Sequence, residues 1–393
     1  MIELLAPAGG MDRLNTAFHF GADAVYLGGK NFSLRSYARN FEQEEILQAV
    51  KYAHGINKKV YITLNIFPKT SDFDAIKEYL QFLKDACVDG VIVSDIGVLE
   101  LALKYGIPVH ISTQANTTNA YAAKVYREMG AQRLILAREL SVDDIKSIKD
   151  KTNIELEVFV HGAMCVSISG RCLLSNYLSD RDSNRGECVQ ACRWEYTVKE
   201  RARGKELTVR EDERGTYIFN SKDLCMLLHL KLLKEAGVDA FKIEGRMKTS
   251  YYVANVVNAY RRVMDNGYNV TDELVKELDK CSHRGYTTGF YLDETDREET
   301  STSKTYGTHE FVAEVIENGD GGIWVEQRNR FYTGDTLEIL SPGENFNKTI
   351  TIDRMYDIYG NIVDDAKLVQ QKLFIPAECG LSRYDILRKK IKE

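Results

Sequence analysis

The sequence predicts an α/β fold in which a (β/α)₈ TIM-like barrel is followed by a small C-terminal all-β barrel domain. Three observations lead to this prediction. Over the first 160 residues, short apolar runs alternate with amphipathic helical segments, as in parallel βα units. A stretch of about 75 residues then interrupts the alternation before its last strand and contains a segment, Cys165–Cys192, with four of the eight cysteines. From about Thr308 the pattern changes to short strands separated by turn residues.

Eight buried strands are expected in the barrel, each rich in aliphatic residues. They are Glu3–Ala6, Ala24–Leu27, Lys59–Ile66, Gly90–Val93, Val109–Ser112, Arg133–Leu136, Leu156–Val160 and Ala240–Ile243. Helices are expected over Asp12–His19, from Ser71 onward, where Ser71 and Asp74 have capping-box spacing, and over roughly Ser250–Asp265. An open doubly wound sheet is the alternative, but no GxGxxG follows any of these strands, so a dinucleotide site has no support.

These patterns also predict the domain boundaries. A catalytic barrel is expected over residues 1–295, a linker over 296–307 and a β-barrel domain over 308–393. The strands expected in that last domain are Phe311–Ile316, Ile323–Gln327, Thr336–Leu340 and Thr349–Met355. The insertion in the barrel covers about 163–236 and follows the seventh strand. Long loops at this end of a barrel usually carry function.

Composition is that of an ordinary globular protein, with 44% apolar and 28% charged residues. The net charge of −6 excludes a basic field over the whole molecule, so any nucleic-acid site would have to be a local patch. The start, MIELLAPAGGMDRL, lacks the basic and apolar regions of a signal peptide, and no apolar run approaches the roughly 20 residues of a membrane span. We therefore expect a cytoplasmic protein with no membrane partner, whose clustered cysteines are metal ligands or catalytic groups rather than disulfides.

The four clustered cysteines indicate a metal centre. Cys165, Cys172, Cys188 and Cys192 are separated by six, fifteen and three residues. Four thiolates suit either a tetrahedral zinc ion or an iron–sulfur cluster. Structural zinc sites usually present cysteine pairs about two to four residues apart, which only Cys188 and Cys192 approach. We therefore expect a cluster with four irons, and zinc is the alternative metal.

Polar residues at the carboxyl ends of the strands are the candidate catalytic residues, because barrel active sites form there. Glu244 and Arg246 follow the eighth strand, where Glu244 either orients Arg246 or moves protons. His161 falls at the end of the seventh strand. It is either a proton shuttle or a side chain that packs beneath the insertion. His161 and Cys165 are four apart, but the strand breaks the helical geometry of a thiolate–imidazole pair. HExxH and GxSxG are also absent, so neither of these peptidase motifs supports a peptidase.

Several segments resemble peptidase family U32, the collagenase-like proteins. The strongest is EVFVHGAMC at Glu157–Cys165, which runs on to SGRC at Ser169–Cys172. The others are LAPAG at Leu5–Gly9, LRSYARNF at Leu34–Phe41, STQAN at Ser112–Asn116, NSKDL at Asn220–Leu224, KIEGRMK at Lys242–Lys248 and RGYTTGFY at Arg284–Tyr291. The cysteine spacing resembles the family pattern, which binds a 4Fe–4S cluster in characterised members. The resemblance covers residues 1–295, and the β-rich tail is similar to the family's C-terminal domain.

The resemblance implies an oxygen-independent hydroxylase, because the better understood relatives hydroxylate RNA bases or the ubiquinone ring with prephenate as hydroxyl donor. The domain layout is most similar to the branch that converts the wobble uridine of tRNA to 5-hydroxyuridine. Hydroxylation of rRNA cytidine or of a ubiquinone precursor, a collagenase-like peptidase and a zinc-stabilised RNA-binding module without catalysis are the alternatives. The sequence does not decide whether the protein works with a paralogous partner subunit or as a homodimer.

This implied chemistry selects further candidate residues. Prephenate carries two carboxylates, which fixed arginine and amide donors would bind. The candidate substrate-binding residues are Arg35, Arg39, Gln114, Asn116, Arg138, Arg171, Asn220 and Lys222. RNA would need a local basic patch with an aromatic side chain for base stacking. The RNA-binding candidates are Arg193, Trp194, Arg201 and Arg203, although nearby acidic residues dilute their charge and a solvated hairpin is the alternative. A weaker basic patch is expected at Arg383–Lys392.

Overall fold

The chain forms two compact units. The computed structural model describes residues 2–30, 32–34, 39–165, 167–193, 211–212, 215–216, 222–292, 305–377 and 380–391. The first unit comprises Met1–Leu14, Ala22–Lys248 and Arg284–Thr305. The second comprises Asn15–Gly21, Thr249–His283 and Tyr306–Glu393.

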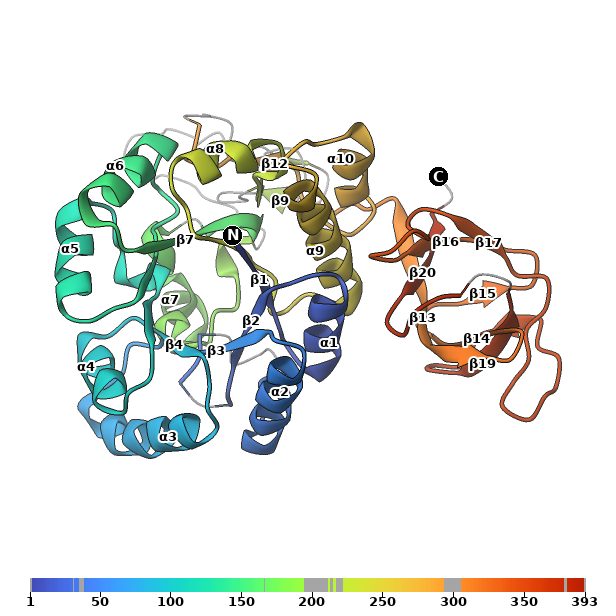
Figure 1. Ribbon diagram of the computed structural model, residues 1–393, viewed down its shortest axis with the longest axis horizontal. Helices are drawn as coiled ribbons and strands as arrows, with labels where there is room; N and C mark the ends of the chain where they lie inside the picture. Colours follow the sequence, from blue (N-terminus) through green and yellow to red (C-terminus); the bar gives the residue numbers. More distant parts are fainter. Residues whose placement is uncertain are drawn as a thin grey trace. The chain divides into compact units, whose positions relative to one another are not determined.

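Eight parallel strands close the barrel of the first unit (Figure 1). They are β1 (Glu3–Pro7), β2 (Ala24–Gly28), β3 (Lys59–Leu64), β4 (Gly90–Val93), β5 (Val109–Ile111), β6 (Arg133–Ile135), β7 (Glu155–Ala163) and β11 (Ala240–Ile243). Strand β11 pairs with both β1 and β7, which closes the sheet and rules out the open doubly wound alternative. The predicted (β/α)₈ barrel is therefore confirmed.

Helices cover the outside of these strands (Figure 1). They include α2 (Gln43–Gly55), α3 (Phe73–Asp85), α4 (Ile96–Lys104), α5 (Ala120–Glu128) and α6 (Val142–Thr152). The capping box expected at Ser71 and Asp74 is wrong. A 3₁₀ turn at Thr70–Asp72 precedes α3, and Asp72 Oδ2 accepts the backbone N–H of Lys69 at 2.7 Å. Helix α1 (Met11–His19) follows β1 in the chain.

The segment between β7 and β11 contains short elements of its own. They are η3 (Ile168–Gly170), α7 (Leu174–Ser179), η4 (Ser183–Arg185), η5 (Ala191–Arg193), β8 (Glu211–Asp212), β9 (Gly215–Thr216), β10 (Asp223–Cys225), η6 (Leu227–His229) and α8 (Leu230–Glu235). Strand β10 runs antiparallel to β7 and pairs with β12 (Tyr286–Thr287). The insertion therefore extends the sheet at β7. The hairpin expected at Glu195–Arg210 lies outside the described residues.

An antiparallel β domain forms most of the second unit, as expected. Its strands are β13 (His309–Gly319), β14 (Gly322–Gln327), β15 (Phe331–Tyr332), β16 (Thr336–Leu340), β17 (Thr349–Thr351), β18 (Asp365–Ala366), β19 (Lys372–Pro376) and β20 (Ile386–Lys390). Six of them form one sheet in the order β17-β16-β20-β13-β14-β19 around a core that includes Val312, Phe331 and Leu387. Helices α9 (Ser250–Asp265) and α10 (Asp272–Leu278) belong to the same unit.

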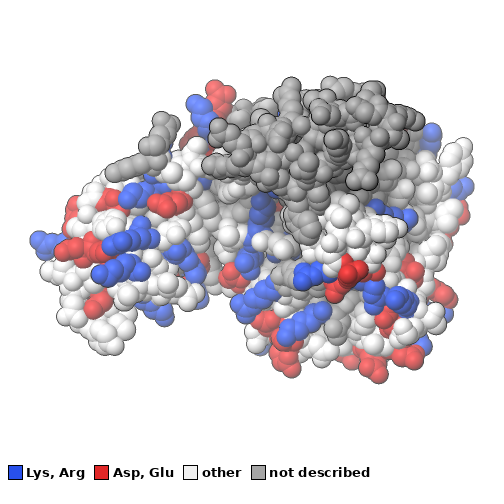
Figure 2. Space-filling model, turned by 180° about the vertical axis from the view of Figure 1, so that it is seen from behind, with Lys and Arg blue, Asp and Glu red and all other residues white. Residues whose placement is uncertain are grey.

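The basic patch expected at Arg383–Lys392 needs a correction. Arg388 is fully buried, and its guanidinium bonds to the carboxylates of Glu277 and Glu338. On the face shown in Figure 2, acidic and basic side chains are interspersed over the β domain. That face of the domain therefore carries no field of a single sign.

Candidate functional site

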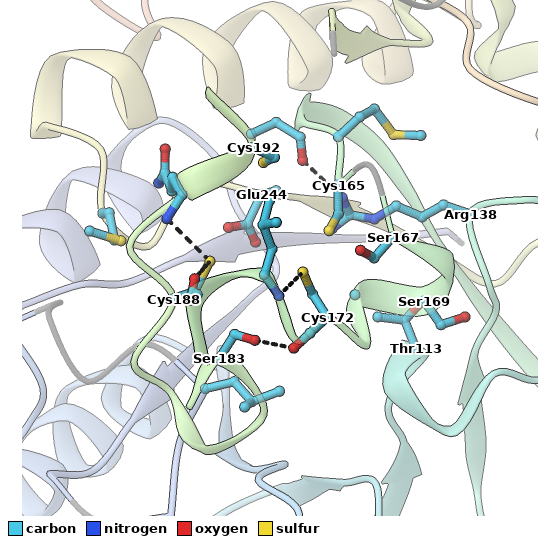
Figure 3. A pocket seen from close by; sticks show the side chains of 18 of the residues that line it. Thr113, Arg138, Cys165, Ser167, Ser169, Cys172, Ser183, Cys188, Cys192 and Glu244 are labelled. Atoms are coloured by element: carbon cyan, nitrogen blue, oxygen red, sulfur yellow. Dashed lines mark hydrogen bonds between the residues drawn. The ribbon is translucent and has the colours of Figure 1, made fainter. Parts of the chain in front are cut away.

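A cavity of about 420 Å³ lies at the carboxyl end of the barrel strands. Most of its wall comes from the loops after β5 and β6, the cysteine segment and the residues that follow β11, and Leu34, Arg284 and Thr305 complete it. Figure 3 shows the four cysteines around this space, with Glu244 among them and Arg138 at one side. The insertion thus closes the cavity over the position where barrel active sites form.

All four clustered cysteines line this cavity with free thiols. Cys165 is exposed and the other three are half-buried. Two of the sulfur atoms accept backbone hydrogen bonds. The N–H of Leu174 lies 3.3 Å from Cys172 Sγ, and the N–H of Gln190 lies 3.4 Å from Cys188 Sγ. Donors of this kind stabilise a thiolate and tune a metal bound to it.

Side chains of the same segment hold the cysteine loop in place. Asn184 accepts the N–H of Cys172 at 3.3 Å and donates to its carbonyl at 3.1 Å. Arg185 then ties the loop to the start of α3, because both of its terminal nitrogens donate to the Asp72 carboxylate, at 2.9 and 3.3 Å. These hydrogen bonds from Arg185, with that from Lys69, hold the pKa of Asp72 below its usual value. The loop is therefore positioned by contacts outside the thiols themselves.

The donor set fits a metal group larger than a single ion. Among the described residues, no three His, Cys, Asp or Glu side chains stand close enough together to hold one ion. The four thiols instead surround a cavity of about 420 Å³, and two of them already receive N–H bonds. A four-iron cluster needs one thiolate from each of four directions. Cys165, Cys172, Cys188 and Cys192 are the residues that would hold it.

Glu244 is held at the centre of the site by the barrel. Its Oε2 accepts a hydrogen bond from the Tyr26 hydroxyl at 3.1 Å, and its N–H bonds to the His161 carbonyl at 2.9 Å. The same tyrosine hydroxyl lies 3.0 Å from the carbonyl of Ile243. Two strands therefore fix the position of one carboxylate that reaches the cavity.

A smaller cavity of about 50 Å³ lies inside the barrel and shares part of its wall with the thiol-lined cavity. Five residues line both: Leu34, Thr113, Gln114, Arg138 and Glu244. Arg246 and Lys242 line only the inner one. Arg246 is nearly fully buried, and its Nη1 donates to the hydroxyls of Ser33 at 2.7 Å and Thr63 at 2.8 Å. We call these two spaces the outer and the inner cavity.

The structure thus brings together several of the residues expected at the site. The four cysteines line the outer cavity, Arg246 lines the inner one, and Gln114, Arg138 and Glu244 line both. The guanidinium of Arg138 lies 3.8 Å over the ring of Phe159, and its Nη1 donates to the Ala163 carbonyl at 2.8 Å. Arg138 forms no ion pair with any described residue. It therefore presents a fixed cation to both cavities.

Other expected residues lie beside the cavities rather than in their walls. Arg39 is exposed at the surface. The Nε of Arg171 donates to the backbone carbonyl of Gln114 at 2.7 Å. Asn116 accepts a hydrogen bond from the Ser169 hydroxyl at 2.6 Å. Arg171 and Asn116 therefore join the cysteine segment to the loop after β5.

His161 and Lys222 line neither cavity. His161 is buried within β7, and its ring centroid lies 5.5 Å from that of Tyr286. The backbone of Arg193 ends η5, and its side chain lies outside the described part of the structure. The remaining expected residues also lie outside the described residues: Arg35, Trp194, Arg201, Arg203 and Asn220.

Three residues of the site were missed from the sequence: Tyr26, Asn184 and Lys242. Tyr26 lies in an apolar strand and looks like a core residue until its hydroxyl is placed beside Glu244. Asn184 is one of many polar residues in a loop, and nothing in the sequence marks it. Lys242 had a usable signal, because it is a charged residue in the middle of the buried strand AFKI.

These features define a TIM-like barrel protein with a thiol-lined cavity at its carboxyl end and an appended β domain. The chain belongs to peptidase family U32. Residues 9–301 match the family described as "Peptidase family U32", and residues 307–388 match the one described as "Peptidase family U32 C-terminal domain". Within the described part of the chain, no helix has the length and apolar character needed to cross a membrane.

The names of curated relatives point to different activities. Over 380 residues the chain is 40% identical to "tRNA hydroxylation protein P1" of Bacillus subtilis (strain 168), covering 93% of this chain and 89% of the relative. Over 398 residues it is 35% identical to "tRNA hydroxylation protein P" of Escherichia coli (strain K12), covering 88% of each. Over 308 residues it is 44% identical to an uncharacterized protease of Methanocaldococcus jannaschii, covering 76% and 74%. Family membership alone therefore does not decide the activity.

Proposed function

We propose that this protein is an iron–sulfur enzyme that hydroxylates tRNA, converting the wobble uridine to 5-hydroxyuridine with prephenate as the hydroxyl donor. The observation that carries the proposal is the convergence of four free thiols on one cavity at the carboxyl end of the barrel, beside Arg138 and Glu244. The names of the two bacterial tRNA hydroxylation relatives support tRNA as the substrate. The donor and the target base rest on the resemblance of the motifs.

The chain's own residues have separate roles in this proposal. The four cysteines would hold the cluster, which supplies a Lewis-acidic or electron-carrying metal centre beside the donor. Arg138 binds a donor carboxylate. Arg246, whose terminal nitrogens already donate to Ser33, Thr63 and Asn40, adds a fixed positive charge beside it. Uridine gains one oxygen atom at C5, and the donor loses that oxygen and takes up the two electrons. Glu244, oriented by the Tyr26 hydroxyl at 3.1 Å, accepts the proton released from C5 and delivers it to the donor carbon that lost the hydroxyl group.

The tRNA assignment is tested by mass spectrometry of nucleosides from a strain that lacks this gene and any paralogue. We expect 5-hydroxyuridine and its derivatives to disappear, to return with the wild-type gene, and to stay absent with Cys172→Ala. A Cys87→Ala copy is the matched control, because Cys87 is a free thiol outside both cavity walls. Unchanged 5-hydroxyuridine in the deletion strain would rule out this substrate.

The cluster assignment is tested by metal analysis of protein purified without oxygen. We expect about four irons and four sulfides per chain for the wild type and for Cys87→Ala. Cys172→Ala and Cys188→Ala should each lose most of both. A colourless protein with one zinc per chain would instead support the zinc alternative and end the cluster proposal.

A further inference from the structure

The inner cavity is built for a compact anion. Three cationic side chains line it, from Arg138, Lys242 and Arg246, and Glu244 is the acidic residue among the lining residues. The charge of Lys242 is balanced by Glu157, so the two arginines face the one carboxylate of Glu244. The cations are held rigidly. Lys242 Nζ donates to Glu157 at 2.7 Å, Arg246 donates to two hydroxyls, and Arg138 lies flat on Phe159. Fixed donors bind an anion without first having to be ordered, which lowers the cost of binding.

The size of the inner cavity limits what can enter it. A buried water needs about 10–15 Å³ of volume measured in this way. A cavity of about 50 Å³ therefore takes a group the size of three to five waters. That is the size of a carboxylate with its attached carbon, and it is too small for a six-membered ring or a nucleobase. The outer cavity, at about 420 Å³, has room for the larger groups.

The inner cavity borders the outer one along the five lining residues that they share. Beneath it the barrel is filled by a buried layer of ion pairs, in which Arg133 Nη1 contacts Glu157 at 3.2 Å and Glu3 at 2.6 Å. Lys242 joins this layer from above through Glu157. A ligand therefore arrives through the wall that the two cavities share.

We propose that the inner cavity anchors one carboxylate of the donor, so that the donor binds first and the RNA base closes the outer cavity above it. This inference rests on the proposed function, since it names the place of the donor within that site. Binding follows a compulsory order, because a base seated in the outer cavity blocks the route to the inner one. A donor already bound is then trapped until the RNA leaves.

The anchor is tested by equilibrium binding of labelled prephenate to the cluster-loaded full-length protein, with binding of an unmodified anticodon stem-loop measured separately. In Arg138→Gln we expect the Kd for prephenate to rise at least tenfold and the Kd for the stem-loop to rise by a smaller factor, because Arg138 also lines the outer cavity. Arg127→Gln is the matched control, because Arg127 also donates to a backbone carbonyl, that of Thr152, but lies on α5 outside both cavity walls. It should change neither constant.

A second variant guards against a folding defect in the first. Gln114 Oε1 accepts hydrogen bonds from the side chains of Ser112 and Asn65, and a carboxylate would accept the same two bonds. Gln114→Glu therefore keeps the shape of the shared wall and adds one negative charge to it. We expect at least tenfold weaker prephenate binding in this variant as well. An unchanged prephenate Kd in Arg138→Gln and Gln114→Glu overturns the anchor and leaves tRNA hydroxylation standing.

The order of binding is tested by the release of labelled prephenate into an excess of unlabelled prephenate. We expect saturating stem-loop RNA to slow release from the wild type at least tenfold. Equal rates with and without RNA overturn the compulsory order. A wild type that binds no prephenate overturns this inference together with the donor of the proposed function, while the nucleoside experiment judges the tRNA substrate independently.

Discussion

Glu157 in β7 and Lys242 in β11 are charged residues inside the barrel. Glu157 is fully buried, Lys242 is nearly so, and Lys242 Nζ lies 2.7 Å from Glu157 Oε1. Burial lowers the pKa of Lys242, while the attraction of Glu157 opposes that shift. Removing two such ions from water costs several kcal/mol each, so each charge depends on its partner.

Glu157→Gln should therefore destabilise the protein by about 3–5 kcal/mol near pH 7, because it leaves the Lys242 ammonium buried without its carboxylate. The pKa of Lys242 in the folded variant falls further below 10.5, so that the unfolded chain binds more protons than the folded one as pH rises towards 10.5. The stability of the variant should then recover relative to the wild type between about pH 7 and pH 9. Urea unfolding at both pH values measures this.

Glu100→Gln is the control for this experiment, because Glu100 pairs with Lys104 on the exposed face of α4. It should change the free energy of unfolding by less than about 0.5 kcal/mol. Similar losses in the two variants would contradict the importance of the buried pair.

At the scale of elements, one buried arginine joins α10 to the β sheet of the second unit. Arg388 in β20 is fully buried, and its Nη2 donates to Glu277 of α10 at 2.9 Å. Its Nε donates to Glu338 of β16 at 2.8 Å. A bidentate guanidinium between two carboxylates fixes both the distance and the angle of the elements that it joins.

Arg388→Met should lower the free energy of unfolding by about 3–5 kcal/mol, because the buried Glu277 carboxylate loses this partner. The double variant Arg388→Met with Glu277→Gln should regain a large part of the loss, since no carboxylate is then left at that position. Chemical denaturation of the wild type, the two single variants and the double variant gives the coupling energy. Strictly additive effects would show that the contact does not hold α10.

The barrel strands could be predicted because each is a buried aliphatic run that ends in polar or glycine residues. The convergence of the four thiols could also be predicted from the sequence, because all four belong to one short segment. Strand β10 could not be predicted, since its three residues, Asp223–Cys225, become a strand only through pairing with β7. The inner cavity was also hidden. Its wall combines side chains from several strands and loops. The tilt and stagger of the strands in the closed barrel decide which of these side chains point inward at the same level.

At the scale of the molecule, the two compact units do not follow the order of the chain. The second unit includes α9 and α10, which precede the C-terminal strands, together with residues 15–21. The first matched family region ends at residue 301, so it includes α9 and α10, although both helices belong to the second unit. A cut between the two matched regions would divide one compact unit.

A chain that ends at residue 305 should accordingly unfold at a lower temperature than the full chain, because Glu277 loses Arg388 and the helices lose the sheet of their own unit. Differential scanning calorimetry under the same conditions measures the midpoints. A chain that ends at Lys390, the last residue of β20, is the control and should keep the full-length midpoint within a few degrees. Equal midpoints for the short and full chains would show that α9 and α10 are stable without the β domain.

The closing strand of the barrel also sets an order of events during synthesis. The sheet cannot close before β11 (Ala240–Ile243) is available, because that strand joins β1 to β7. The four thiols end at Cys192, about 50 residues earlier in the chain. At about 5–20 residues per second, roughly 2–10 s pass between the emergence of the last thiol and the strand that completes the barrel. Under the proposed function, a metal group would therefore have an interval for delivery in which the thiols are made and the barrel beneath them is still open.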